Sequence, residues 1–510
     1  MVYLSGVFCA LKDMGLFDCC TYTSGLSGSN WFLSMLYSHP EWPKIHPQVV
    51  KNEMRDIFED NWMMKFLFSP SWLINHLKII QGKKERGQPV TFTDFFGYLI
   101  GDVLRIKRKD VPKLSDQQRV VKDGLVPFPL YNCVHVKTDV PAREFGEWVE
   151  FTPYEIGMAK YGTFVKTEQF GNKFFCGKLV RSYKEPPIHF LEGLYGSAYT
   201  FVVQRCLASG KKPASLEDQI RITGELLQEL HNGGAIDSDE SLCFDAEESD
   251  NEEAQEDDVK AKQQLVEQEP EEDDSFENFL KFLAEKFPIL KTREGRAGLV
   301  HNFLRGLQLP SAPVPSGPDA VEDTVDQYSV RSERIFLIDS GLVFGSPNPM
   351  FFMTPQRTVD VFLSFETSDR RWDDNPPFKE LLLAEEWAKK NNVKFPPINA
   401  EEQFKKYGMK ELYVFRHPTD PSCPIVMHFV MVNLTFREES APGVKRKTDE
   451  EKKFADFKIL DDPDNSYSTF RFQYPNLQFD RLSDLGYFNT LLGEDAIKDV
   501  MAECVKKLRA

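Results

Sequence analysis

The stretch Thr23–Trp31, which reads TSGLSGSNW, places a serine between two glycines just ahead of the helix-like run FLSMLY. Gly25 and Gly28 permit a tight turn from a strand into a helix. Ser27 would then lie at the carboxyl end of the strand and at the amino end of the helix, where backbone N–H groups and the helix dipole favour developing negative charge. The stretch therefore predicts Ser27 as the nucleophile of a hydrolase, with the N–H of Gly28 as an oxyanion donor.

An ordinary turn is the alternative interpretation of the same residues. Serine and glycine cluster in many turns, and Ser29 stands where the motif G-x-S-x-G has its last glycine. The rest of the chain has to decide between the two interpretations.

Asp339 is the candidate base because it directly follows the strand-like run RIFLI and precedes Ser340 and Gly341. It would lie at the carboxyl end of a strand, where open α/β sheets place their sites. None of the nine histidines lies in a motif that marks it as a base. Arg357 could hold a phosphate through two parallel hydrogen bonds. A turn-forming Asp and a surface or ion-pair Arg are the structural alternatives.

The composition indicates a globular chain of 510 residues with 41% hydrophobic residues. No apolar run reaches the roughly 20 residues of a membrane span, and the start shows no signal peptide. The nine cysteines form no C-x-x-C pair, which suits a reduced cytosolic compartment and predicts neither a disulfide framework nor a metal site. Asp237–Glu277 holds 19 Asp and Glu against two Lys and so carries the whole net charge of −17. A neutral remainder gives no support for nucleic-acid binding.

Two segments are predicted to be irregular. Residues 235–275 are too polar to bury a core and are expected to be a disordered acidic insertion, and residues 309–326 form a loop rich in Pro, Ser and Ala. The segment Pro213–Gly234 is amphipathic and could be a movable lid or a helix packed permanently on the core.

Alternating helix and strand patterns predict an α/β fold with a central sheet. The expected helices and strands are helices at Gly6–Lys12, Asn30–Ser38 and Pro377–Asn392, and strands at Asp18–Thr23, Arg334–Ile338, Val359–Glu366, Glu411–Phe415 and Ile425–Val432.

The chain resembles the catalytic domain of group IV cytosolic phospholipase A2, most of all the calcium-regulated alpha type. The similarity runs along residues 1–510 and is carried by segments that include GLSGSNWFLSMLYSHPEW, QPVTFTDFFGYLIGDVL, VEFTPYEIGMAKYGTF, TREGRAGLVHNFLRGL, DSGLVF and STFRFQYPN. The family itself has G-L-S-G-S, so Ser29 fits its motif. The resemblance implies a patatin-like α/β fold with a mixed central sheet, flanking helices and a lid or cap region.

Residue by residue, the resemblance implies that Ser27 accepts the acyl group, that Asp339 is its partner and that Arg357 contacts the phospholipid head group. Residues 213–234 match the lid. The implied reaction is hydrolysis of the sn-2 ester of a glycerophospholipid at a membrane surface, in the cytoplasm and peripheral to intracellular membranes. It needs no cofactor in this chain, because calcium acts in the family through a C2 domain that is not matched here.

Several departures from the family pattern keep alternatives open. The glycine-rich oxyanion loop of the family lies upstream of the position of Met1, which leads us to expect an N-terminally shortened domain. Gly317 follows Ser316 where the family has a proline after its phosphorylated serine. Arg331 and Arg334 remain from a basic patch that contacts anionic lipids, but Glu333 and Leu299 replace lysines. A lipid-binding module with impaired catalysis, a lysophospholipase and a transacylase remain alternatives, and the oligomeric state is open.

Overall fold

The computed structural model describes residues 1–59, 66, 69–136, 147–200, 297–308, 330–342, 357–368, 370–464, 466–467 and 473–509. The expected lid at 213–234, the acidic insertion at 235–275 and the loop at 309–326 lie outside them. Within the described residues, no helix combines the length and apolar character that a membrane crossing requires.

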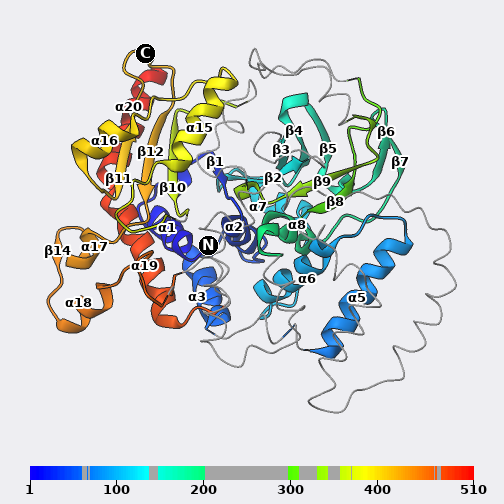
Figure 1. Cartoon of the computed structure of the whole chain (residues 1–510), viewed down its shortest axis with the longest axis horizontal. Coiled ribbons are helices and arrows are strands. Elements are labelled where there is room, and N and C mark those ends of the chain that lie inside the picture. The colour runs from blue at the N-terminus through cyan, green and yellow to red at the C-terminus, as the bar shows by residue number, and fades with distance from the viewer. Residues whose placement is uncertain are drawn as a thin grey trace.

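The fold is α/β, as the sequence predicts, and it contains two separate groups of paired strands (Figure 1). The larger sheet has the order β5-β4-β3-β2-β9-β8, with β1 also paired to β2. The smaller sheet has the order β10-β12-β11. The strands of these sheets are β1 (Tyr22–Ser24), β2 (Phe128–Val136), β3 (Glu147–Phe151), β4 (Glu155–Met158), β5 (Thr163–Lys166), β8 (Gly298–His301), β9 (Arg334–Ile338), β10 (Val361–Glu366), β11 (Leu412–Phe415) and β12 (Ile425–Val430).

Two hairpins, β6 (Lys173–Phe175) with β7 (Lys178–Arg181) and β13 (Glu439–Ala441) with β14 (Val444–Lys445), stand apart from these sheets. Helices surround the strands, and α2 lies near the centre of the view (Figure 1). The helices are α1 (Val2–Asp13), α2 (Gly28–Tyr37), α3 (Pro47–Phe58), α5 (Pro70–Glu85), α6 (Phe92–Leu104), α7 (Gln118–Val121), α8 (Ile188–Tyr195), α15 (Lys379–Lys390), α16 (Ala400–Tyr407), α17 (Thr435–Glu438), α18 (Asp449–Ala455), α19 (Asn476–Leu492) and α20 (Glu494–Arg509).

The alternation of side chains along β2 separates two hydrophobic cores. Tyr131 and Cys133 belong to the core that also contains the buried residues of α2, α6 and α8. Leu130, Val134 and Val136 belong to a second core shared with β10, β12 and α15. Since successive strand residues point to opposite faces, each face of this one strand supports a different layer.

One predicted strand begins four residues later than expected, and two predicted helices begin earlier than expected. Residues 17–19 form a short 3-10 turn, in which Cys20 N–H donates to Phe17 O at 3.2 Å, so β1 starts only at Tyr22. Helix α2 begins at Gly28, two residues before the predicted start, and α1 begins at Val2. The strand at Arg334–Ile338 has the predicted bounds.

Candidate active site

Strands β1 and β9 converge on the middle of β2. β1 runs parallel to β2 and pairs with residues 128–130, whereas β9 runs antiparallel and pairs with residues 134–136. The carboxyl ends of both strands therefore point toward residues 131–133 from opposite directions. Ser27 follows β1 and Asp339 follows β9, so strand pairing alone brings together two side chains 312 residues apart in sequence.

Ser27 occupies a strained turn at the start of α2. Its φ of 51° and ψ of −122° lie in a region that L-residues rarely adopt, at a cost of about 1–3 kcal/mol. The hydroxyl makes no capping bond to α2 and instead donates to Asp339 Oδ2 at 2.7 Å. The N–H of Gly28, the first residue of the helix, has no acceptor among the described residues, which leaves it available to an oxygen beside Ser27.

Asp339 is completely buried, and its carboxylate has defined partners. Oδ1 accepts the N–H of Gly341 at 2.9 Å, and the backbone N–H of Ala198 also bonds to the carboxylate. The N–H of Asp339 itself donates to Ser197 Oγ at 2.9 Å. Burial raises the pKa of Asp339 to about 7, although these hydrogen bonds and that of Ser27 oppose the shift. A carboxylate with this pKa can accept a proton near neutral pH.

Asn132, on β2, connects the turn that carries Ser27 to the turn that carries Asp339. Its amide Nδ2 donates to Gly25 O at 2.7 Å and approaches Ser24 Oγ at 3.4 Å, and its Oδ1 accepts the hydroxyl of Ser340. Gly25 and Ser340 flank the two candidate catalytic residues. The buried amide of Asn132 therefore fixes the distance between the turn that carries Ser27 and the turn that carries Asp339.

Arg357 joins this network through Glu150. Its terminal nitrogens Nη1 and Nη2 each lie 2.5 Å from an oxygen of the Glu150 carboxylate, which is fully buried. Glu150 on β3 is the cross-strand partner of Asn132, so the two side chains lie on the same face of the sheet. The Arg357 guanidinium also lies 5.6 Å from the ring of Tyr22 on β1. The predicted phosphate ligand is thus beside the strand ends, held in a bidentate ion pair.

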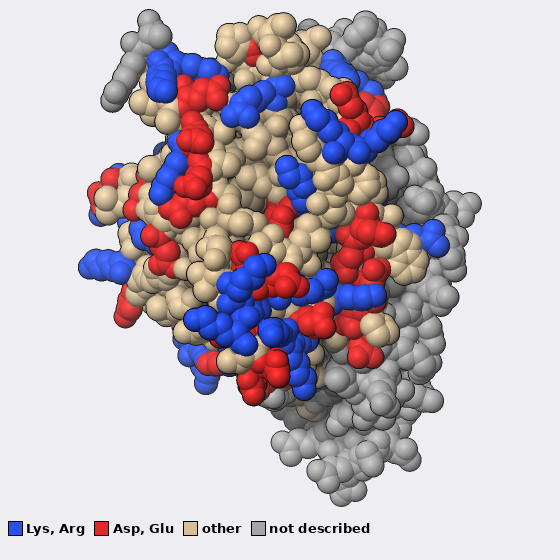
Figure 2. Space-filling model, turned by 90° about the vertical axis from the view of Figure 1, so that its left-hand side faces the viewer, with Lys and Arg blue, Asp and Glu red and all other residues tan. Residues whose placement is uncertain are grey.

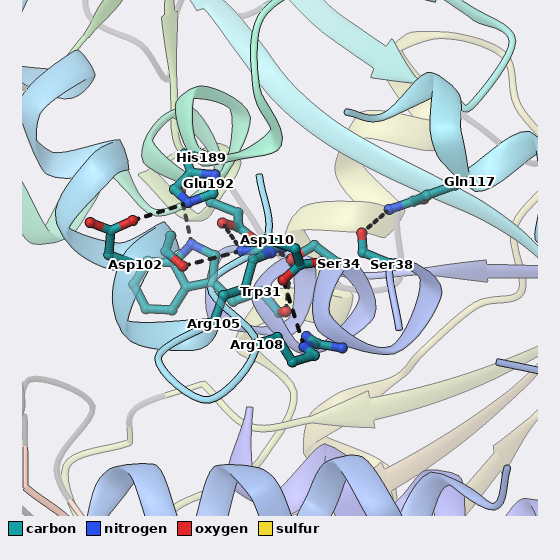
Figure 3. A network of polar contacts seen from close by, with 11 residues as sticks. Trp31, Ser34, Ser38, Asp102, Arg105, Arg108, Asp110, Gln117, His189 and Glu192 are labelled. Atoms are coloured by element: carbon teal, nitrogen blue, oxygen red, sulfur yellow. Dashed lines mark hydrogen bonds and ion pairs between the residues drawn. The ribbon is translucent and has the colours of Figure 1, made fainter. Parts of the chain in front are cut away.

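Behind Ser27, α2 is anchored by a buried ion pair (Figure 3). Arg105 and Glu192 pair through two bonds of 2.7 and 2.8 Å, and both are essentially inaccessible to water. Trp31 Nε1–H of α2 donates to Glu192 O at 2.8 Å, and the hydroxyl of Ser34 donates to the Glu192 carboxylate. Glu192 thus links α2 to α8 and to the end of α6, which immobilises the helix that carries the strained turn.

The predicted lipid contacts Arg331 and Arg334 both lie on the surface, at the start of β9. Glu333, between them, pairs with Lys173 at 3.4 Å and with Arg305 at 3.4 Å. His428 is buried in β12 and bonds to Pro377 O at 2.7 Å, which is a core position. No three His, Cys, Asp or Glu side chains of the described segments are grouped so that they could hold a metal ion.

Asn132, Glu150, Ser197 and Ser340 were not singled out from the sequence. A signal was available for two of them, because Asn132 interrupts the apolar strand FPLYNCVHV and Glu150 lies in the buried strand EWVEF. A polar residue inside a buried strand needs a partner. The partners themselves could not be read from the sequence, since they lie between about 20 and more than 200 residues away.

Residues 1–464 match the family model described as "Lysophospholipase catalytic domain". The chain is 31% identical to the mouse protein "Cytosolic phospholipase A2 zeta" over 526 aligned positions, which cover 100% of this chain and 56% of that protein. This chain thus spans only about half the length of that relative.

Two solved human structures resemble 99% of the chain at 26% identity. The first is "Human GIVD cytosolic phospholipase A2", with a TM-score of 0.74. The match covers 61% of that protein's chain. The second is the same protein "in complex with Methyl gamma-Linolenyl Fluorophosphonate", with a TM-score of 0.66 over 57% of its chain.

Proposed function

The chain belongs to the lysophospholipase catalytic-domain family of lipid-hydrolysing enzymes, as a catalytic domain of the group IV cytosolic phospholipase A2 type, and from this premise we propose that it hydrolyses the sn-2 acyl ester of glycerophospholipids through an acyl-serine intermediate. The observation that carries the proposal is the 2.7 Å hydrogen bond from the strained Ser27 hydroxyl to the buried carboxylate of Asp339.

In the proposed first step, Asp339 accepts the hydroxyl proton while Ser27 Oγ attacks the ester carbonyl carbon. The negative oxygen of the tetrahedral intermediate is stabilised by the N–H of Gly28 and the amino end of α2. Collapse breaks the bond to the glycerol oxygen, which takes the proton from Asp339 and leaves as lysophospholipid.

In the second step, Asp339 takes a proton from a water molecule, which attacks the acyl-serine and releases the fatty acid. The proton then returns to Ser27 Oγ. Every proton in this cycle moves through the one carboxylate, which is why a pKa near neutrality supports the proposal.

We propose that Arg357 contacts the phosphate of the substrate. Glu150 already occupies both of its terminal nitrogens, so the phosphate would share or displace that carboxylate. Arg331 and Arg334, exposed at the start of β9, are proposed contacts for anionic lipid head groups. The proposed setting is the cytoplasmic surface of intracellular membranes.

Hydrolysis of lysophospholipids is a second candidate, favoured by the description of the matching family. The same acyl-serine would also serve a transacylase, in which an alcohol replaces the water. A lipid-binding module without turnover is the alternative of a different class. Assays with diacyl and lysophospholipid vesicles, with and without an acceptor alcohol, separate the three reactions by their products.

A fluorophosphonate tests the proposal directly, because a relative has been solved in complex with one. Methyl γ-linolenyl fluorophosphonate should phosphonylate Ser27 with loss of fluoride, and mass spectrometry should find the adduct on the peptide that contains Ser27. Ser27→Ala should remove the adduct, and Asp339→Asn should slow its formation by at least a hundredfold. An unlabelled wild-type chain would support the lipid-binding module instead.

A further inference from the structure

A groove of about 820 Å³ lies at the end of α5, away from the turns of Ser27 and Asp339. Its walls come from the carboxyl end of α5, from α6, and from the segment that connects β7 to α8. Ile79, Ile80, Val111, Pro186 and Phe190 give it an apolar lining. Apolar surface exceeds polar surface in the groove, so an amphiphilic ligand fits it better than a fully solvated one.

Positive charge dominates the rim of this groove. Five cationic side chains line it against two carboxylates, and the cations are Lys83, Arg86, Lys113, Arg181 and Lys184. Both carboxylates already have partners: Asp94 accepts Lys83 at 2.5 Å, and Glu185 accepts the hydroxyl and the backbone N–H of Ser115.

Four of these cations, Arg86, Lys113, Arg181 and Lys184, are exposed and have no carboxylate partner in the part of the chain that the structure describes. The Arg181 guanidinium also lies 5.3 Å from the ring of Tyr183. Cations arranged without counter-charges attract an anionic surface.

The hairpin of β6 and β7 continues the groove with exposed apolar side chains. Phe175, Leu179 and Val180 are 53%, 43% and 65% exposed, and Val111 on the rim is 60% exposed. Arg181 ends β7 and also lines the groove. Tyr183 OH donates to Gly87 O at 3.2 Å, which fixes the segment after the hairpin against the end of α5. Figure 1 shows β7 and the end of α5 along the same edge of the molecule.

The opposite side of the molecule has a different charge pattern. Figure 2 shows the side on which α16 and α18 lie, where patches of Lys and Arg are interspersed with Asp and Glu and separated by uncharged surface. The groove joins cations that have no carboxylate partner among the described residues to exposed large apolar residues. Cations that flank apolar side chains are typical of segments that lie in the interface of an anionic bilayer.

We propose that this groove and the β6–β7 hairpin form a docking surface for an anionic phospholipid bilayer, separate from the active site. The cations Arg86, Lys113 and Lys184 contact lipid phosphates, and the side chains of Phe175 and Val180 enter the acyl boundary. The choice of a lipid partner rests on the proposed function, but the surface itself is defined by the groove and the hairpin.

Vesicle sedimentation with the Ser27→Ala chain tests the docking surface without hydrolysis. The probes are vesicles of phosphatidylcholine alone and vesicles in which about one-third is phosphatidylserine, a content that gives the bilayer a negative surface potential. The chain should prefer the anionic vesicles, and added salt should weaken that preference. The groove variant combines Arg86→Gln, Lys113→Gln and Lys184→Gln.

Each cation near an anionic surface strengthens binding by about fivefold, so the groove variant should bind at least tenfold more weakly. The matched control combines Lys405→Gln, Lys406→Gln and Lys410→Gln, which removes the same charge from exposed positions on and after α16. The control should bind within about twofold of the parent, as expected when its residues lie outside the contact.

Val180→Asp tests the apolar contact and should also weaken binding at least tenfold. Equal losses in the groove variant and the control would mean that only net charge matters and would overturn the proposal. Unchanged vesicle binding in the groove variant would overturn it too, and would point to an acidic protein as the occupant. When the three groove substitutions are made in the chain that keeps Ser27, fluorophosphonate labelling should proceed at the parental rate. This measurement distinguishes failure of the docking proposal from failure of the proposed role of Ser27.

Discussion

Replacing Asp339 with Asn should abolish ester hydrolysis and at the same time stabilise the fold at neutral and alkaline pH. Burial raises the pKa of Asp339 from its ordinary value of about 3.8 to about 7. A shift of about three pKa units corresponds to about 4 kcal/mol between the two protonation states.

The sign follows from proton binding. Because the native state keeps the proton to a higher pH than the unfolded chain, the stabilising contribution is complete below about pH 4 and is lost as the pH rises through 7. Asparagine stays neutral throughout. The free energy of unfolding of Asp339→Asn should therefore increase, relative to that of wild type, by up to about 4 kcal/mol between pH 4 and pH 8.

Glu366 supplies a matched control, since burial raises its pKa to about 7 as well. Glu366→Gln should show the same pH-dependent gain in stability, measured from urea unfolding midpoints, but should keep hydrolysis. For the wild type, kcat/KM should rise with an apparent pKa near 7 and should be about a hundredfold lower at pH 5 than on the plateau. A flat rate from pH 5 to 8, or a stability difference for Asp339→Asn that does not change with pH, would refute the reasoning.

Four further substitutions test the surroundings of Ser27 and Asp339. Asn132→Ala should lower kcat about 10- to 100-fold while KM changes little, because small displacements between reacting groups have effects of that size. Stopped-flow measurement of the acylation rate would check it. An unchanged rate would mean that the two turns hold their positions without the amide. Arg357→Ala should slow phospholipid cleavage at least tenfold and spare a phosphate-free ester, whereas equal loss on both would make the residue structural. Glu150→Gln should lower KM for the phospholipid, since it removes the carboxylate charge that competes with phosphate for the guanidinium. Gly25→Ala should inactivate the enzyme in the same assay, because its Cβ would lie 2.7 Å from the backbone nitrogen of Asn30; full activity would show that the turn can widen.

The sequence predicts the two turns well because each depends on local chemistry. An apolar run followed by Asp-Ser-Gly marks the end of β9 at Ile338, and two glycines around a serine mark the turn before α2. The strand predicted at Asp18–Thr23 begins only at Tyr22, because backbone bonds to Leu16 and Phe17 close a 3-10 turn before it, and periodicity over six residues does not reveal such bonds.

What the sequence cannot supply is the register between distant strands. That β1 and β9 approach β2 from opposite ends, and leave three residues of it between them, is a property of long-range pairing. Without the register, neither the 2.7 Å contact between Ser27 and Asp339 nor the role of Asn132 follows from composition or spacing. The resemblance to a family supplied the pairing of the two catalytic residues but not the amide that holds them.

The ion pair between Arg357 and Glu150 has a consequence for how a substrate phosphate can be recognised. Without Glu150, the half-buried guanidinium of Arg357 would lose its bidentate partner, and removing one partner of a buried pair costs about 3–5 kcal/mol. Glu150 therefore stabilises the guanidinium in the absence of substrate. The same carboxylate competes with the phosphate for the two terminal nitrogens. The net binding free energy of the phosphate is therefore only the difference between the free energies of the two charge-assisted pairs. An arginine held in this way would select for a phosphate without binding it tightly, which favours release of the lysophospholipid after the acyl group has moved to Ser27.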